Sequence, residues 1–112
     1  MIAQVSRVEL RARLEAALPK IVEQLAAIGA RRIVLFGSLA RGEVARSSDI
    51  DLIVVLDAPG RFMDRLTAVY EALDVDVGVD ALVYTSEEFA ELAATRPFIQ
   101  RALREGRLLY AA

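Results

Sequence analysis

Residues 32–56 decide the fold, and they read RIVLFGSLARGEVARSSDIDLIVVL. The β-branched and aromatic run at 32–36 predicts a buried strand. Residues 38–44 predict a brief helix, and Ser47-Ser48 predicts a turn. The apolar run at 50–56 is the strongest strand signal in the chain. These patterns predict two buried strands joined by a short helix and a turn.

Two carboxylates, Asp49 and Asp51, lie at the head of the second predicted strand. Because they are two residues apart, the alternation of a strand places both side chains on the same face. Like charges roughly 5–7 Å apart repel each other and disfavour folding unless a cation joins them. Taken alone, the pair is explained equally well by a frayed and solvated strand end. The buried run that follows favours a cation site.

The turn at Gly37-Ser38 has features of a phosphate-binding turn. A strand ends and a helix begins there, so free backbone N–H groups point beyond the sheet edge. Gly37 has no side chain to keep a phosphate away, and the Ser38 hydroxyl adds a donor. Arg41 can supply a positive charge or tie the turn to a nearby acid. A Gly-Ser pair is usually only a turn, but beside Asp49 and Asp51 it indicates a metal ion with a polyphosphate.

The rest of the chain alternates helices and strands. Ser6 predicts the start of a helical stretch at Arg7, and Pro19 is expected to divide that stretch in two. Further helices are predicted over residues 62–73, from a Ser86 cap, and from Pro97 to Gly106, and further strands over 77–84 and 108–110. We therefore expect the α/β (α+β) class, with a small mixed sheet and helices packed on it, as a single domain over residues 1–112.

The composition limits the available chemistry. The 112 residues include no Cys and no His, which excludes disulfides, thiolate nucleophiles, Ser-His-Asp triads and His-ligated metals. Any metal would be held by oxygen, as magnesium and manganese are. A net charge of −2 argues against non-specific binding to nucleic acid. No signal peptide is visible and no apolar run approaches the roughly 20 residues that span a bilayer, so a cytoplasmic location is expected, away from membranes.

The spacing of Gly37-Ser38, ten further residues and Asp49-Ile50-Asp51 resembles the signature of the polymerase-beta-like nucleotidyltransferase superfamily. The fuller string, GSLARGEVARSSDIDL, is similar to the minimal nucleotidyltransferases, the small antitoxin-like partners of HEPN-domain proteins. The resemblance implies that Gly37 and Ser38, with Arg41, grip a triphosphate while Asp49 and Asp51 bind Mg2+ or Mn2+. It also implies transfer of AMP from ATP to a hydroxyl, such as a tyrosine of the HEPN partner.

The same resemblance implies a third carboxylate on a later strand, which completes the metal site and helps to deprotonate the acceptor hydroxyl. Asp74, Asp76 and Asp80 share parity, so alternation does not separate them. Asp80 leads directly into the apolar run at 81–84, as Asp51 leads into its own run. Asp80 is therefore the preferred residue and Asp76 the second choice.

Three functions stay open. The first is a metal-dependent nucleotidyltransferase that modifies its partner HEPN toxin as the antitoxin of a pair, in a hetero-oligomer. The second is similar chemistry on a small molecule or a nucleic-acid end, which usually needs a further domain to hold the acceptor. About 28 residues follow Tyr84, enough for two short helices. The third is a catalytically silent antitoxin that acts by binding alone.

Two other sets of residues have simpler explanations than catalysis. The tyrosines are predicted to be packing residues rather than modification sites: Tyr70, Tyr84 and Tyr110. The arginines near the C-terminus predict a solvated helix face, with a partner or nucleotide-base contact as the alternative: Arg96, Arg101, Arg104 and Arg107.

Overall fold

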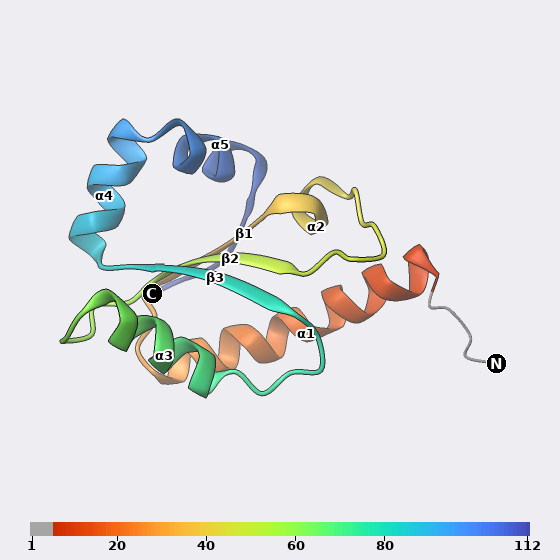
Figure 1. Ribbon diagram of the computed structural model, residues 1–112, viewed down its shortest axis with the longest axis horizontal. Coiled ribbons are helices and arrows are strands. Elements are labelled where there is room, and N and C mark those ends of the chain that lie inside the picture. The colour runs from red at the N-terminus through yellow and green to blue at the C-terminus, as the bar shows by residue number, and fades with distance from the viewer. Residues whose placement is uncertain (1–5) are drawn as a thin grey trace.

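A mixed four-stranded sheet lies between two layers of helices in the computed structural model, which describes residues 6–112 (Figure 1). In chain order the elements are α1 (Arg7–Ala27), β1 (Arg32–Phe36), α2 (Gly37–Arg41), β2 (Ile50–Val55), α3 (Phe62–Ala72), β3 (Val79–Tyr84), α4 (Ser86–Thr95), α5 (Pro97–Glu105) and β4 (Arg107–Ala111). The predicted fold class is confirmed, and β1 and α5 begin at the residues expected from the sequence.

The strand order is β3-β2-β1-β4. β1 runs antiparallel to both of its neighbours, whereas β2 and β3 are parallel. The end of β1 therefore meets the beginnings of β2 and β3 at one edge of the sheet. In this register Asp51 faces Phe36 of β1 on one side and Asp80 of β3 on the other. The topology thus brings the Gly37 turn and the carboxylates of two strands to the same edge.

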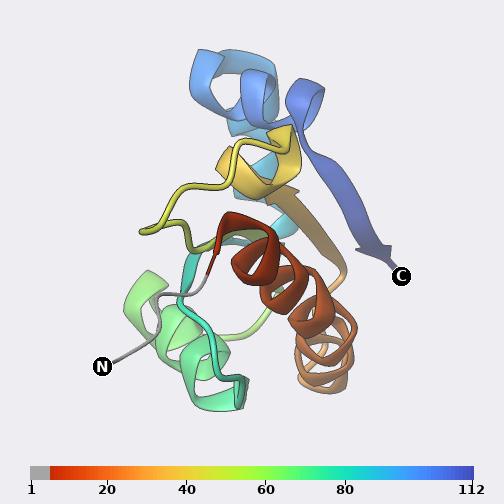
Figure 2. The ribbon, with the colours of Figure 1, turned by 90° about the vertical axis from the view of Figure 1, so that its right-hand side faces the viewer.

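The two faces of the sheet bury different cores. Alternate residues of β2, such as Leu52 and Val54, pack with α1 and α3 in the larger cluster. Ile53 and Val55 point the other way and pack with Phe89 of α4 and side chains of α5. Burying each large aliphatic side chain contributes about 1.5–3 kcal/mol, which is why β2 is apolar on both faces. Figure 2 shows α4 and α5 above the sheet, and α1 and α3 below it.

The predicted division of the first helical stretch at Pro19 is wrong. α1 is continuous, with Pro19 inside it. A proline in a helix interior costs about 3 kcal/mol because it removes a hydrogen bond and crowds the preceding turn. Leu14 and Leu18 before it, and Ile21 and Leu25 after it, are all buried, and one continuous helix keeps all four in the core. Their burial offsets the cost of the proline.

The predicted cap of α4 is displaced by one residue. Thr85 is the N-cap, not Ser86, because its side chain accepts from the Glu88 backbone while Glu88 reaches back to the Thr85 backbone. Ser86 instead donates to the Asp57 carboxylate. Within residues 6–112, no helix is both long and apolar enough to cross a membrane.

Candidate functional site

The turn after β1 is built around a glycine, at a position where a side chain would be strained and would displace a neighbour. Gly37 has φ +76°, a left-handed conformation that favours glycine. A Cβ atom at this position would also overlap the carboxylate oxygen Oδ2 of Asp51. The backbone of the turn therefore lies directly against the carboxylate at the head of β2.

Asp51 and Asp80 are paired residues of the parallel strands β2 and β3, so their side chains project on the same face of the sheet. Burial raises the pKa of Asp51 above its ordinary value, and the charges of Asp80 and then Asp49 raise it further. The Arg41 guanidinium acts in the opposite direction and lowers the pKa. A partly buried carboxylate is thus surrounded by two like charges and one compensating cation.

Asp49 lies beside the start of β3. A Cβ atom on Gly78 would overlap the Asp49 carboxylate, so this glycine leaves the space that the side chain occupies. The Gly78 carbonyl accepts a hydrogen bond from the Ile50 backbone at 2.9 Å, which fixes the two segments together. The sequence analysis missed Gly78, because its role depends on a contact between segments about 30 residues apart.

The three carboxylates of Asp49, Asp51 and Asp80 are chemically suited to a hard cation. They offer only oxygen donors, which magnesium and manganese prefer. No described residue donates a hydrogen bond to any of them or forms an ion pair with one, and the Arg41 charge lowers the pKa of Asp51 without such a direct contact. In their present positions, however, no three acidic side chains within residues 6–112 come close enough to share one metal ion. Their donor chemistry fits a divalent cation, and a closed three-ligand cage is not formed.

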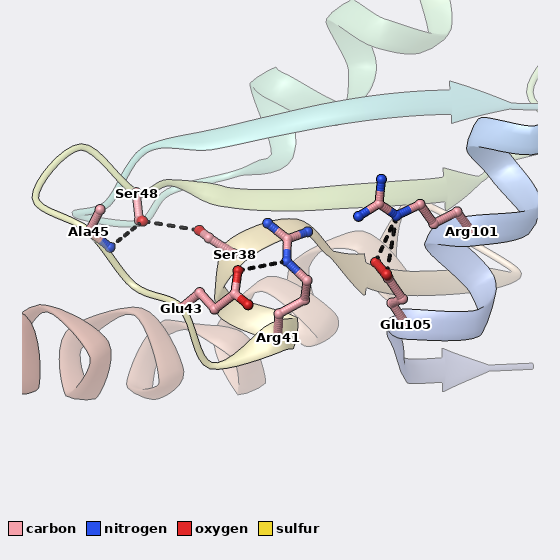
Figure 3. Close-up of polar contacts among 7 residues, drawn as sticks. All are labelled: Ser38, Arg41, Glu43, Ala45, Ser48, Arg101 and Glu105. Atoms are coloured by element: carbon pink, nitrogen blue, oxygen red, sulfur yellow. Dashed lines mark hydrogen bonds and ion pairs between the residues drawn. The ribbon is translucent and has the colours of Figure 1, made fainter.

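Ser38 is held in place by a residue that the sequence analysis assigned only to a turn. Its hydroxyl donates to Ser48 Oγ at 3.0 Å, and Ser48 Oγ accepts from the Ala45 backbone at 2.8 Å (Figure 3). The loop between α2 and β2 is thereby tied back to the turn. A hydroxyl next to the DID segment was the available signal for Ser48, but its partner ten residues away was not predictable from spacing.

Arg41 points its side chain toward the same region. Its Nε donates to Glu43 Oε2 at 3.1 Å, which leaves the two terminal nitrogens without an acceptor among the described residues (Figure 3). Such an arginine can present both terminal nitrogens to a phosphate or a carboxylate.

The other candidates for the third carboxylate lie apart from this cluster. Asp76 pairs with Arg13 of α1, at 3.5 Å between Oδ2 and the guanidinium nitrogen. The backbone of Asp74 exchanges hydrogen bonds with the Gln24 side chain. Of these acids, only Asp80 affects the pKa of Asp51. The geometry therefore places Asp80, and neither alternative, beside Asp51.

A tight glycine turn next to acids on two adjacent strands is an arrangement suited to a polyphosphate with a cation. Residues 16–110, which contain all of it, match the nucleotidyltransferase domain family. The chain belongs to that family. The nucleotidyltransferase domain is 37% identical over 81 residues to a Methanocaldococcus jannaschii protein described as a protein adenylyltransferase, covering 71% of this chain and 78% of that protein. Nucleotidyl transfer is the class of reaction that the family performs.

Solved structures share the fold of this nucleotidyltransferase domain. A Sulfolobus solfataricus protein described as a nucleotidyltransferase superimposes with a TM-score of 0.67 at 24% identity, covering 94% of this chain and 86% of its own. A toxin–antitoxin structure with AMP-PNP superimposes with a TM-score of 0.57 at 26% identity, covering 85% of this chain and 73% of its own. A Shewanella oneidensis complex of a tri-AMPylated HEPN toxin with an MNT antitoxin gives 0.52 at 22% identity, with coverage of 88% and 73%. The resemblance to the minimal nucleotidyltransferases is confirmed.

Proposed function

We propose that the nucleotidyltransferase domain transfers AMP from ATP to a hydroxyl of a protein partner, and that this partner is the HEPN-type toxin of a toxin–antitoxin pair. The observation that carries the proposal is the packing of the Gly37 turn against Asp51, with Asp80 paired to Asp51 across β2 and β3. The description of the Methanocaldococcus jannaschii relative as a protein adenylyltransferase supports a protein acceptor. The shared fold with antitoxins in toxin complexes supports the choice of partner.

In this proposal the turn binds the triphosphate. Gly37 lets the phosphates approach the backbone, the Ser38 hydroxyl donates to them, and Arg41 offers its terminal nitrogens. In the structure this hydroxyl donates to Ser48 Oγ at 3.0 Å, so its proton turns from Ser48 to a phosphate oxygen when the triphosphate binds. These residues position the α-phosphate at the sheet edge, next to the carboxylates.

Asp49, Asp51 and Asp80 would hold a divalent cation, Mg2+ or Mn2+. When bound, such a cation neutralises phosphate charge and stabilises the attacking and leaving oxygens. Asp80 accepts the proton of the acceptor hydroxyl as that oxygen forms its bond to the α-phosphorus, and the bond from phosphorus to pyrophosphate breaks. The products are an AMP ester on the acceptor and pyrophosphate.

The test of these roles separates nucleotide binding from transfer. With labelled ATP, magnesium and the proposed toxin partner, Asp80→Asn should abolish label transfer while most of the ATP affinity remains. Asp76→Asn is the matched control, because it removes the same charge from a neighbouring position that pairs with Arg13. Transfer that persists in Asp80→Asn and fails in Asp76→Asn would assign the third carboxylate to Asp76.

A further inference from the structure

A second recess adjoins the Gly37 turn on the side of α5. It has a volume of about 290 Å³, and it is lined by Phe36, Gly37, Arg41, Phe98, Arg101 and Glu105, together with Ala102. Pockets for whole small ligands usually begin at roughly this size, so the recess suits only part of a nucleotide. Since Gly37 belongs to both, the recess is continuous with the turn described above.

Two arginines from different elements face this recess. Figure 3 shows the Arg101 side chain extending from α5 toward α2, where Arg41 projects. Arg101 Nε donates to both carboxylate oxygens of Glu105 at 3.1 Å, and Arg41 Nε donates to Glu43 at the same distance. Among the described residues, none accepts from the terminal nitrogens of either arginine. Both guanidinium groups are thus oriented by a glutamate while their outer edges stay free.

The chemistry of the recess favours an anion over a nucleobase. Of the lining side chains, Arg41 and Arg101 carry positive charges and Glu105 one negative charge. Phe36 and Phe98 contact each other edge to face, with 5.7 Å between ring centroids, and they form the apolar side of the recess. Arginines whose outer edges are free form charge-assisted, often bidentate, hydrogen bonds with phosphate oxygens.

The recess also adjoins the carboxylates. Gly37 and Arg41 both line it, and a Cβ atom on Gly37 would overlap the carboxylate of Asp51. An anion held between Arg41 and Arg101 would therefore lie next to the site of the α-phosphate. On the side away from the nucleoside, the α-phosphate of a nucleoside triphosphate is followed by the β- and γ-phosphates.

We propose that the recess between α2 and α5 binds the terminal phosphates of the nucleoside triphosphate, with Arg101 as a phosphate-binding residue alongside Arg41. This inference rests on the proposed nucleotidyl transfer and adds to it a residue outside the GSLARGEVARSSDIDL motif. Glu105 acts as a positioning residue that orients Arg101 and moderates its charge. The pyrophosphate product would leave from the same recess.

The test measures affinity for magnesium tripolyphosphate, magnesium ATP and AMP by calorimetry. Arg101→Gln should lower the affinity for tripolyphosphate and for ATP by about tenfold, as expected for loss of a charge-assisted contact, and leave the affinity for AMP unchanged. Arg104→Gln is the matched control, because it removes the same charge from an exposed position of α5 outside the recess. Glu105→Gln should strengthen tripolyphosphate binding severalfold, a gain that a damaged fold would not produce.

Equal affinities in Arg101→Gln and Arg104→Gln would overturn the proposal. The proposal would also be overturned if Arg101→Gln lost affinity for both AMP and ATP yet bound tripolyphosphate normally, because the recess would then hold the nucleoside. Transfer to the partner is measured separately with wild-type protein. If no AMP is transferred but tripolyphosphate binding depends on Arg101, only the proposed function is contradicted. If AMP is transferred but tripolyphosphate binding does not depend on Arg101, only the proposed role of the recess is contradicted.

Discussion

Gly37 and Asp51 are in such close contact that any side chain at residue 37 would displace the Asp51 carboxylate. Two independent constraints act at this position, namely the φ of +76° and the adjacent carboxylate. A change at residue 37 therefore affects stability and the proposed binding site together.

Gly37→Ala should lower the free energy of unfolding by about 1–2 kcal/mol from backbone strain alone, with a further loss from displacement of Asp51. Magnesium-dependent ATP binding should fall in the same variant. Gly29→Ala is the matched control, since Gly29 has φ +96° but no atom within 4 Å of an added Cβ. Urea unfolding and calorimetry on both variants make the comparison. ATP affinity that is equal in both variants would contradict the role of the Gly37 contact.

The raised pKa of Asp51 predicts that its ionisation opposes folding. The unfolded chain releases this proton near the ordinary value of 3.8, whereas the folded chain releases it at higher pH, so stability is lost as pH rises through this window. Without metal, Asp51→Asn should therefore raise the melting temperature at neutral pH by a few degrees. The advantage should disappear as pH falls toward 3.8.

Asp57→Asn provides a control of opposite sign. Hydrogen bonds from the Ser86 side chain and backbone lower the pKa of Asp57, so its charge stabilises the fold above the ordinary value of 3.8. Asp57→Asn should lower the melting temperature at neutral pH, and the deficit should fade in acid. Melting curves of wild type and both variants between pH 3 and 7 would reveal the two signs. A destabilised Asp51→Asn at neutral pH would refute the account of this carboxylate.

Ser48→Ala should loosen the loop that holds the Ser38 hydroxyl. The variant loses the hydrogen bonds from Ser38 and from the Ala45 backbone, each contributing about 0.5–1.5 kcal/mol to the free energy of unfolding. ATP affinity should fall severalfold because the loop between α2 and β2 is no longer tied to the turn that is proposed to bind the triphosphate. Ser47→Ala changes the exposed neighbouring serine and should affect neither quantity. Chemical denaturation and ATP titration compare the two variants. Equal stability and equal ATP affinity in Ser48→Ala and Ser47→Ala would contradict the role of Ser48 in tying the loop to the turn.

The local elements could be predicted from sequence because their signals are local. The β-branched run of β1 and the proline at the start of α5 both define their boundaries within a few residues. Pro19 misled the prediction because its local penalty is outweighed by burial of Leu14 and Leu25 on either side, a tertiary effect.

Only part of the candidate site could be predicted from the sequence. Asp49 and Asp51 are close in sequence, and Asp80 could be preferred because it begins a buried strand. The space that Gly78 leaves for Asp49 and the recess that Arg101 shares with Arg41 depend on packing between distant segments. Arg101 was expected on a solvated helix face, and its side chain is indeed largely exposed, but it borders the recess. No spacing rule connects α5 to the turn after β1.

The most direct measurement is the intact mass of the proposed HEPN-type partner after incubation with this chain, ATP and magnesium. We expect a gain of about 329 Da for each AMP transferred, and we expect no gain when the metal is chelated or when Asp51→Asn replaces the wild type. A partner that is bound and inhibited while its mass stays unchanged would contradict the account and identify the chain as an antitoxin that acts by binding alone.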